Sequence, residues 1–176
     1  MYGPSLPTMI SPNQPHLFQD EHDASLITPV DFSGVKCMSY GFASTGKTAI
    51  MRGPMVSNLV VQLIGQTNWG ELDYLVIDFP PGTGDIQLTL AQELNITGAV
   101  IVTTPQKLSY VDVTKGIDMF DDLKVPTVAL VENMSYYKCT SCDDKHRIFG
   151  RGFTNQIKTN YGIENSYEVP IVEEIA

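Results

Sequence analysis

The chain has 176 residues, of which 43% are hydrophobic, and this apolar content is enough to fill one core of moderate size. Eleven Lys and Arg residues against twenty Asp and Glu residues give a net charge of −9, which repels a phosphate backbone and argues against nucleic acid as a partner. No apolar run approaches the roughly 20 residues needed to cross a bilayer, so no membrane-spanning segment is predicted.

The first part of the chain, residues 1–33, is rich in proline and has no hydrophobic periodicity. We therefore expect an irregular, exposed segment there. It has the features of neither a signal sequence nor a basic, acid-poor transit peptide. The three cysteines of the whole chain are too few for a secreted disulfide framework, and they favour a reducing compartment.

A phosphate-loop pattern, G-x-x-x-x-G-K-[ST], is present from Gly41 to Thr48, after a strand expected over 35–42. Such a loop requires a helix that begins at its Lys-Thr pair, so that the helix N-terminus faces the phosphates. Gly53-Pro54 instead places the helix start at Pro54, because proline suits the first helical turn and disfavours helix at the residue before it. We interpret 44–48 as a polar turn and expect Lys47 to be dispensable for nucleotide binding.

After residue 34, apolar runs of strand length alternate with helical patterns. The helix from Pro54 carries one apolar stripe, made of Val56, Leu59, Val60, Leu63 and Ile64. Strands rich in Val and Ile are expected at 72–79, 98–104 and 125–133, covered on both faces. Helices are expected at 85–94, 107–122 and 152–160. This order predicts an α/β fold with a parallel sheet flanked by helices, which binds ligands at the carboxyl ends of its strands.

The string "YLVIDFPPGTGD" follows this rule, because a buried strand leads into Asp78 and then into a turn of Pro and Gly. P-loop NTPases hold Mg²⁺ through such a carboxylate, usually by way of water, and the glycines let backbone N–H groups approach a γ-phosphate. The alternative is that Asp78 is a solvated strand end and Asp85 only the N-cap of the next helix. The complete string favours a nucleotide site.

The second chemical feature is the C-x-x-C pair, Cys139 and Cys142. Two thiolates at this spacing can bind one metal ion or one edge of a cluster, whereas a closed Zn or Fe-S site needs four ligands. The alternatives are a zinc knuckle that uses His146 and a redox pair, although a redox pair needs a helix that begins at the motif. Cys37 lies in an expected strand and is interpreted as a small buried hydrophobe.

Several strings resemble, in order and spacing, the Mrp/ApbC family of MinD-like P-loop ATPases that carry iron-sulfur clusters: "YGPSLP", "MRGPMV", "LDYLVIDFPPGTGDIQLTLAQ", "GAVIVTTPQ", "VENMSYYKCTSCDDKHRIFG" and "VPIVEEIA". Residues 70–126 are especially similar to the plastid branch, the high-chlorophyll-fluorescence type scaffold. The resemblance implies a partial MinD-like P-loop NTPase domain over 1–176, with a switch-like segment at 1–33 and a cysteine loop at 134–150. It implies the plastid stroma as the location if the plastid branch holds, and the cytoplasm otherwise.

In this family the phosphate loop lies upstream of the segment that begins here at Tyr2. The resemblance therefore implies that the phosphate-loop unit is lacking from this chain, so whether the chain is an ATPase stays open. Phosphoryl transfer depends on that loop for positioning and charge neutralisation. We expect the 176-residue chain by itself neither to hydrolyse ATP nor to bind it tightly, and its uncovered sheet edge or face to favour aggregation.

The resemblance also assigns roles to matching residues. Asp78 corresponds to the Mg²⁺ partner, and it is a candidate for catalysis together with Asp85. The switch that senses the γ-phosphate of ATP corresponds to Gly82, Thr83, Gly84 and Asp85. Asn133 corresponds to the residue that reads the adenine edge, with the backbone at Pro170 beside the base. The alternative for Asn133 is a turn-forming residue after a strand.

For the cysteines, the resemblance implies a [4Fe-4S] cluster shared by Cys139 and Cys142 across a homodimer, and transfer of that cluster to recipient apoproteins. Relatives commonly have Pro where this chain has Thr140, so the loop is expected to be less rigid. The predicted function is an ATP-dependent iron-sulfur cluster carrier or scaffold. The alternatives are a non-hydrolysing metal-binding or docking fragment and a partitioning ATPase, which would leave the C-x-x-C pair unexplained.

Overall fold

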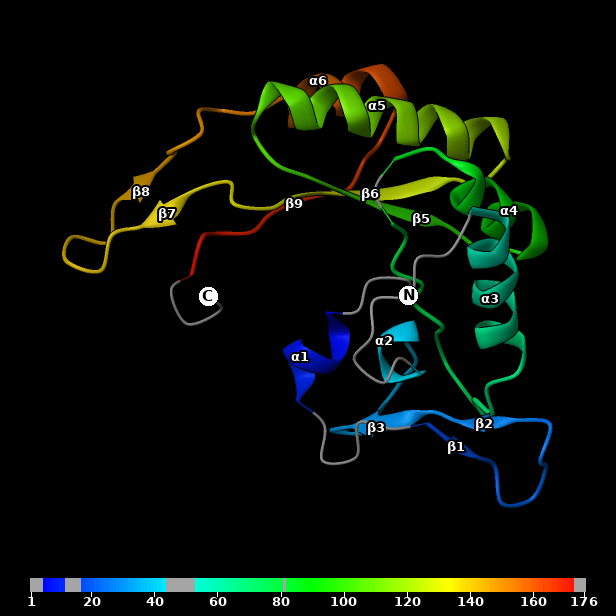
Figure 1. The fold of residues 1–176 in the computed structure, drawn as a ribbon. Helices are drawn as coiled ribbons and strands as arrows, with labels where there is room; N and C mark the ends of the chain where they lie inside the picture. The colour runs from blue at the N-terminus through cyan, green and yellow to red at the C-terminus, as the bar shows by residue number, and fades with distance from the viewer. Residues whose placement is uncertain (1–4, 12–16, 44–52, 81, 173–176) are drawn as a thin grey trace. The chain divides into compact units, whose positions relative to one another are not determined.

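The structure is a computed structural model that describes residues 5–11, 17–43, 53–80 and 82–172 (Figure 1). The chain forms two compact units, Met1–Glu93 and Leu94–Ala176, and each is described by itself. Lys47 and the 44–48 turn lie outside the described residues. None of the helices in the described ranges has the length and apolar character needed to cross a membrane.

The first unit begins with short elements: α1 (Leu6–Ile10), β1 (Phe18–Gln19), β2 (Ile27–Thr28), β3 (Val30–Phe32), β4 (Val35–Cys37) and α2 (Tyr40–Ala43). β1 pairs with β2 and β3 with β4, both antiparallel. The expectation of an irregular 1–33 is therefore wrong in part. The missed signal is Ser33-Gly34, where φ is +53° and +83°, as in the two-residue turns that favour tight hairpins.

The strand expected over 35–42 ends at Cys37. The buried Ser39 is the physical reason, because its Oγ accepts a hydrogen bond from the Gly41 N–H at 3.1 Å. Short side-chain hydrogen bonds of this kind compete with a strand ladder and favour a helical turn, and α2 begins at Tyr40.

Two helices, α3 (Gly53–Gly65) and α4 (Asp85–Glu93), pack together in the first unit. The start of α3 is within one residue of the predicted start at Pro54. Val56, Val60 and Leu63 of its apolar stripe are buried, as are Leu90 and Ala91 of α4. Both predicted helices are confirmed.

Residues 72–79 do not form the predicted strand. They run without assigned secondary structure, and two of their side chains are almost fully exposed, Tyr74 at 86% and Val76 at 88%. β-propensity needs a neighbouring strand to act on, and within the described ranges no strand pairs with this segment. Asp78 therefore ends an exposed segment, not a buried strand.

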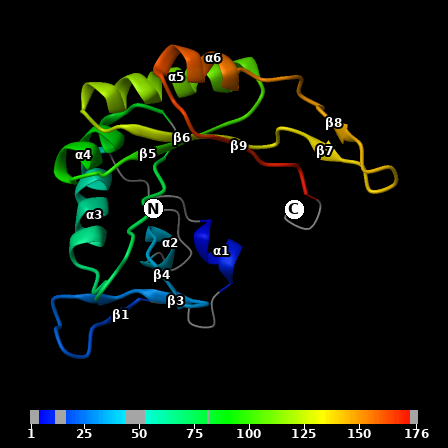
Figure 2. The same ribbon diagram turned by 180° about the vertical axis from the view of Figure 1, so that it is seen from behind.

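The second unit is built on a parallel sheet of three strands, ordered β5 (Ala99–Thr103), β6 (Thr127–Glu132) and β9 (Ser166–Glu168). Helices α5 (Lys107–Asp122) and α6 (Thr154–Tyr161) lie along the same face of this sheet (Figures 1 and 2). Ile117, Leu130 and Ile157 are fully buried between these layers. The predicted α/β fold with a parallel sheet flanked by helices is confirmed.

The sequence predicts strands that are covered on both faces, whereas the described residues of this unit cover only one face of the sheet. Along β5 burial alternates, with Ala99, Ile101 and Thr103 buried, while Val100 is 55% exposed and Val102 59% exposed. The reason is that α5 and α6 share one face. Beyond the sheet, a short hairpin of β7 (Tyr137–Lys138) and β8 (Lys145–His146) forms most of the predicted cysteine loop.

Candidate functional site

The first group of predicted site residues forms a turn before α4. Thr83 and Gly84 are exposed, and Gly82 is exposed with φ +94°, a conformation that glycine adopts without strain. Asp78 is also exposed. Asp85 is the first residue of α4. The turn thus presents its backbone outwards, directly before a helix N-terminus, as phosphate recognition requires.

Gln87 supports this turn, a role for which its sequence context gives no signal. Its side chain is only 4% exposed, and its Nε2 donates a hydrogen bond to the Pro80 carbonyl at 3.0 Å. A Cβ on Gly84 would lie 3.4 Å from the Gln87 Oε1. The amide therefore packs against the inner side of the turn and holds the chain on both sides of the glycines.

The second group lies at the carboxyl ends of the parallel strands in the other unit. The Asn133 N–H donates to the Thr103 carbonyl at 2.7 Å, and the Val169 N–H donates to the Glu132 carbonyl at 2.9 Å. These bonds bring Asn133 and the chain at Pro170 to one edge of the sheet. The Asn133 Oδ1 also accepts a bond from the Met134 N–H at 3.0 Å, so the turn-forming role is present, and adenine recognition stays a prediction.

The cysteine loop is a β-hairpin that brings its ligand atoms together. The Cys139 N–H donates to the Asp144 carbonyl and the Asp143 N–H to the Cys139 carbonyl, both at 2.9 Å. The Sγ atoms of Cys139 and Cys142 and a ring nitrogen of His146 all lie within 4.8 Å of one another. The structure therefore offers two thiols and one imidazole to a metal at one place.

The thiols of the chain differ in their electrostatic surroundings. The Ser141 N–H, followed by the N–H and the side chain of Cys142, donates hydrogen bonds that lower the pKa of the Cys139 thiol. Burial, with a smaller contribution from Asp31, raises the pKa of the Cys37 thiol. Cys37 is half-buried, and its Sγ donates to the Val35 carbonyl at 3.6 Å. Cys139 is therefore the thiol better prepared to bind metal as a thiolate.

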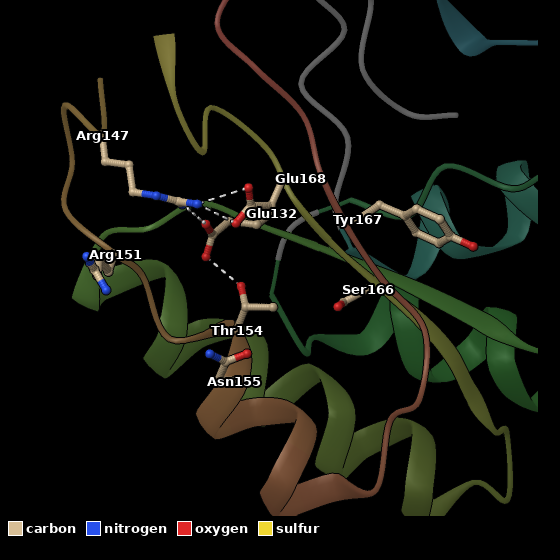
Figure 3. Close-up of a pocket in the computed structure, with 8 residues that line it drawn as sticks. All are labelled: Glu132, Arg147, Arg151, Thr154, Asn155, Ser166, Tyr167 and Glu168. Atoms are coloured by element: carbon tan, nitrogen blue, oxygen red, sulfur yellow. Dashed lines mark hydrogen bonds and ion pairs between the residues drawn. The ribbon is translucent and has the colours of Figure 1, made fainter. Parts of the chain in front are cut away.

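A buried carboxylate holds the root of the hairpin (Figure 3). Glu132, at the end of β6, is 1% exposed and accepts hydrogen bonds from the hydroxyls of Ser135, at 2.7 Å, and Thr154. Arg147, just after β8, lies 3.9 Å from its Oε1 and donates two bonds to Glu168 of β9, at 2.8 and 3.1 Å. The two ends of the hairpin are thus joined through one charged cluster to two strands of the sheet.

The cluster lines a pocket of about 380 Å³. Its lining residues are Glu132, Arg147, Arg151, Thr154, Asn155, Ser166, Tyr167 and Glu168 (Figure 3). Gly152 lies against the Glu132 carboxylate, since φ is +61° there and a Cβ would lie 2.1 Å from the Glu132 Oε2. Only glycine fits so close to the buried carboxylate.

A family model described as "NUBPL iron-transfer P-loop NTPase", of the ParA group, matches residues 1–176, the whole chain. The chain belongs to this family. The predicted family resemblance is confirmed, and we refer to the molecule below as a NUBPL-type chain.

Relatives of this NUBPL-type chain agree with the assignment. It is 51% identical over 171 residues to the chloroplastic Fe-S cluster assembly factor HCF101 of Arabidopsis thaliana, covering 97% of this chain and 31% of that protein. It is 41% identical over 172 residues to the iron-sulfur cluster carrier protein of Escherichia coli K12, covering 97% of this chain and 46% of that protein.

A solved structure shares the fold. It is a nucleotide-binding protein from Archaeoglobus fulgidus in complex with ADP and with cobalt, 34% identical, with a TM-score of 0.81 over 98% of this chain and 67% of that one. The NUBPL-type chain spans less than half of each of the two relatives named above, 31% of the Arabidopsis protein and 46% of the Escherichia coli protein.

Proposed function

We propose that this chain carries the cluster-binding hairpin and the nucleotide-sensing turn of an ATP-dependent iron-sulfur cluster carrier. The observation that carries the proposal is the pair Cys139 and Cys142 on an exposed hairpin, with their Sγ atoms within 4.8 Å of each other. Membership of an iron-transfer NTPase family supports it.

The cargo is a [4Fe-4S] cluster bound between two copies of the chain. One hairpin supplies two thiolates, and such a cluster takes four cysteine ligands. Because residues 140–150 are all exposed, the hairpin is accessible both to a second copy and to a recipient apoprotein. The four thiolates of a homodimer complete the ligand set, and separation of the two chains releases the cluster.

Each of the two groups of residues described above has its own proposed role toward ATP and Mg²⁺, and we expect these contacts to add to those of a phosphate loop. Asp78 holds a Mg²⁺ ion through water, Asp85 assists hydrolysis, and Gly82, Thr83 and Gly84 sense the γ-phosphate through backbone N–H groups. Asn133 reads the adenine edge, and the chain at Pro170 flanks the base. Asn133 directly follows Glu132, which holds the hairpin root, so a shift of the strand end on nucleotide binding is transmitted to the cysteines.

Like its Arabidopsis relative, this protein acts in the plastid.

Anaerobic reconstitution with iron and sulfide tests the proposal. The protein is expected to gain iron, sulfide and visible absorbance, and to dimerise with the cluster. Cys139→Ser and Cys142→Ser are each expected to lose both the cluster and the dimer, because one thiolate per chain cannot complete the four ligands. Cys37→Ser, a matched control in the other unit, is expected to keep the cluster. Retention of iron and sulfide by the Cys139→Ser protein would contradict the shared site.

A further inference from the structure

The face of the cysteine hairpin that carries Cys139 also carries a histidine. β7 and β8 pair with Tyr137 opposite His146 and Lys138 opposite Lys145. Side chains alternate between the two faces of a strand, so Cys139 shares the face of Tyr137, and His146 shares it as the direct partner of Tyr137. The two lysines project to the other face. The register of pairing therefore places an imidazole beside a thiol.

The loop brings Cys142 to the same place. Asp143 has φ +60°, and its N–H bond to Cys139 closes the turn. The three ligand atoms lie within 4.8 Å of one another. In a tetrahedral zinc site the ligand atoms lie about 3.5–3.8 Å apart, as follows from Zn–S of about 2.3 Å and Zn–N of about 2.0 Å. The three atoms therefore need to close by only about 1 Å, which side-chain rotation on an exposed hairpin allows.

We propose that Cys139, Cys142 and His146 hold one divalent ion of the zinc class within a single chain, as a mononuclear state distinct from the cluster-bridged dimer. Two thiolates and one imidazole are ligands that Zn²⁺ and Co²⁺ both accept. The two thiolates balance the charge of the ion. Asp144, whose Oδ2 is 3.6 Å from the Cys142 Sγ, lies beside the fourth position, which water fills.

The mononuclear site uses the same two thiolates, Cys139 and Cys142, that are proposed to bind the cluster. It rests on the proposed function only in the statement that these thiolates also bind a cluster in a dimer. A chain without a cluster then keeps its cysteines as metal-bound thiolates, which protects them from oxidation. Loading a cluster displaces both the ion and His146, because four cysteines of two chains complete the cluster.

Anaerobic titration of the metal-free protein with Co²⁺ tests the mononuclear site, with visible absorbance reporting thiolate coordination and light scattering reporting oligomeric state. We expect one Co²⁺ per chain in a monomer, displaced by Zn²⁺. His146→Gln is expected to weaken Co²⁺ binding at least tenfold. The matched control His22→Gln, in the other unit, is expected to bind as the unchanged protein does. His146→Cys is expected to restore binding, with the absorbance of three thiolates.

Equal Co²⁺ affinity in the His146→Gln protein, or one Co²⁺ per two chains in a dimer, would overturn the proposal. Cluster reconstitution of the same proteins separates it from the carrier function. We expect His146→Gln to keep iron and sulfide, and loss of the cluster there would overturn the distinction between the two states. If the unchanged protein forms no cluster but binds Co²⁺ through His146, the carrier function fails and the mononuclear site stands.

Discussion

The turn before α4 and the cysteine hairpin are two regions with candidate chemistry, and they are held in different ways. The turn at Gly82–Gly84 is supported by a neutral, buried amide, that of Gln87, which reaches a backbone carbonyl. The hairpin has no buried side chain between residues 140 and 150 and is fixed at its root by Glu132 and Arg147. A short exposed hairpin is marginally stable alone, so its position depends on charged groups outside it.

This difference shows where each region is most sensitive to substitution. A neutral hydrogen bond contributes about 0.5–1.5 kcal/mol, whereas a bond to a charged group contributes about 1.5–3 kcal/mol. Loss of a group at the hairpin root should therefore have the larger effect, although that root lies outside the residues that would bind metal.

The largest effect is expected for Glu132→Ala. It removes a buried acceptor of two hydroxyls and leaves Arg147 with Glu168 as its remaining carboxylate partner, so the free energy of unfolding should fall by about 3 kcal/mol. Urea unfolding followed by circular dichroism measures this, and amide hydrogen exchange over 135–147 should become faster. The matched control is Glu168→Ala, because the Glu168 side chain is 41% exposed and its loss should cost about 0–1 kcal/mol. Equal losses in the two variants would show that the buried Glu132 carboxylate is no more important to stability than the exposed Glu168 carboxylate.

An intermediate effect is expected for Gln87→Ala. Without the amide, the turn loses its bond to the Pro80 carbonyl, at a cost of about 1 kcal/mol. Hydrogen exchange at residues 82–84 should become faster, while exchange in the hairpin should not change. Gln92→Ala is the control, because Gln92 is an exposed glutamine on the same helix. Unchanged exchange at the turn in the Gln87→Ala protein would show that the turn is held by other contacts.

The smallest effect is expected at Tyr161, a site in neither region. Burial, followed by the neighbouring Asp118, raises the pKa of Tyr161 to about 12, and its hydroxyl donates to the Asp118 Oδ1 at 2.9 Å. A tyrosine in the unfolded chain loses its proton near pH 10. The unfolded state therefore binds fewer protons between pH 10 and 12, and stability should fall slightly over that range. The ultraviolet difference spectrum between the unchanged protein and Tyr161→Phe should titrate near 12; titration near 10 would contradict the assignment.

The sequence predicted the second unit well, because helix periodicity and Val-rich runs are local signals that the sheet reinforces. α5 has the predicted bounds, and β5 and β6 lie within their predicted ranges. Residues 72–79 have the same apolar character but form no strand, since pairing depends on a neighbour that composition does not reveal. The prediction that both faces of the sheet are covered is also wrong, because α5 and α6 both pack on one face and the sequence of a strand does not reveal on which face a helix packs.

For the site, the motifs located the groups that chemistry requires but not the groups that hold them. Cys139 and Cys142 follow from their spacing, and His146 was named as a zinc alternative. Gln87 and Glu132 were missed, because a polar residue in a helix or at a strand end gives no signal of burial. Arg147 is a cation that could have indicated an ion pair at the hairpin root. Its partner Glu168 lies 21 positions away in the sequence, so no local pattern connects the two residues.

The close approach of Gly152 to Glu132 has a consequence for comparing sequences. Any side chain at position 152 would place its first carbon 2.1 Å from the buried carboxylate oxygen, so the two positions cannot vary independently. Among homologous chains, a larger residue at 152 should occur only together with a shorter residue at 132, and the hydroxyls at 135 and 154 should then be replaced as well. The pair therefore predicts a pattern of correlated substitution that marks which homologues keep the charged root and which have rebuilt it.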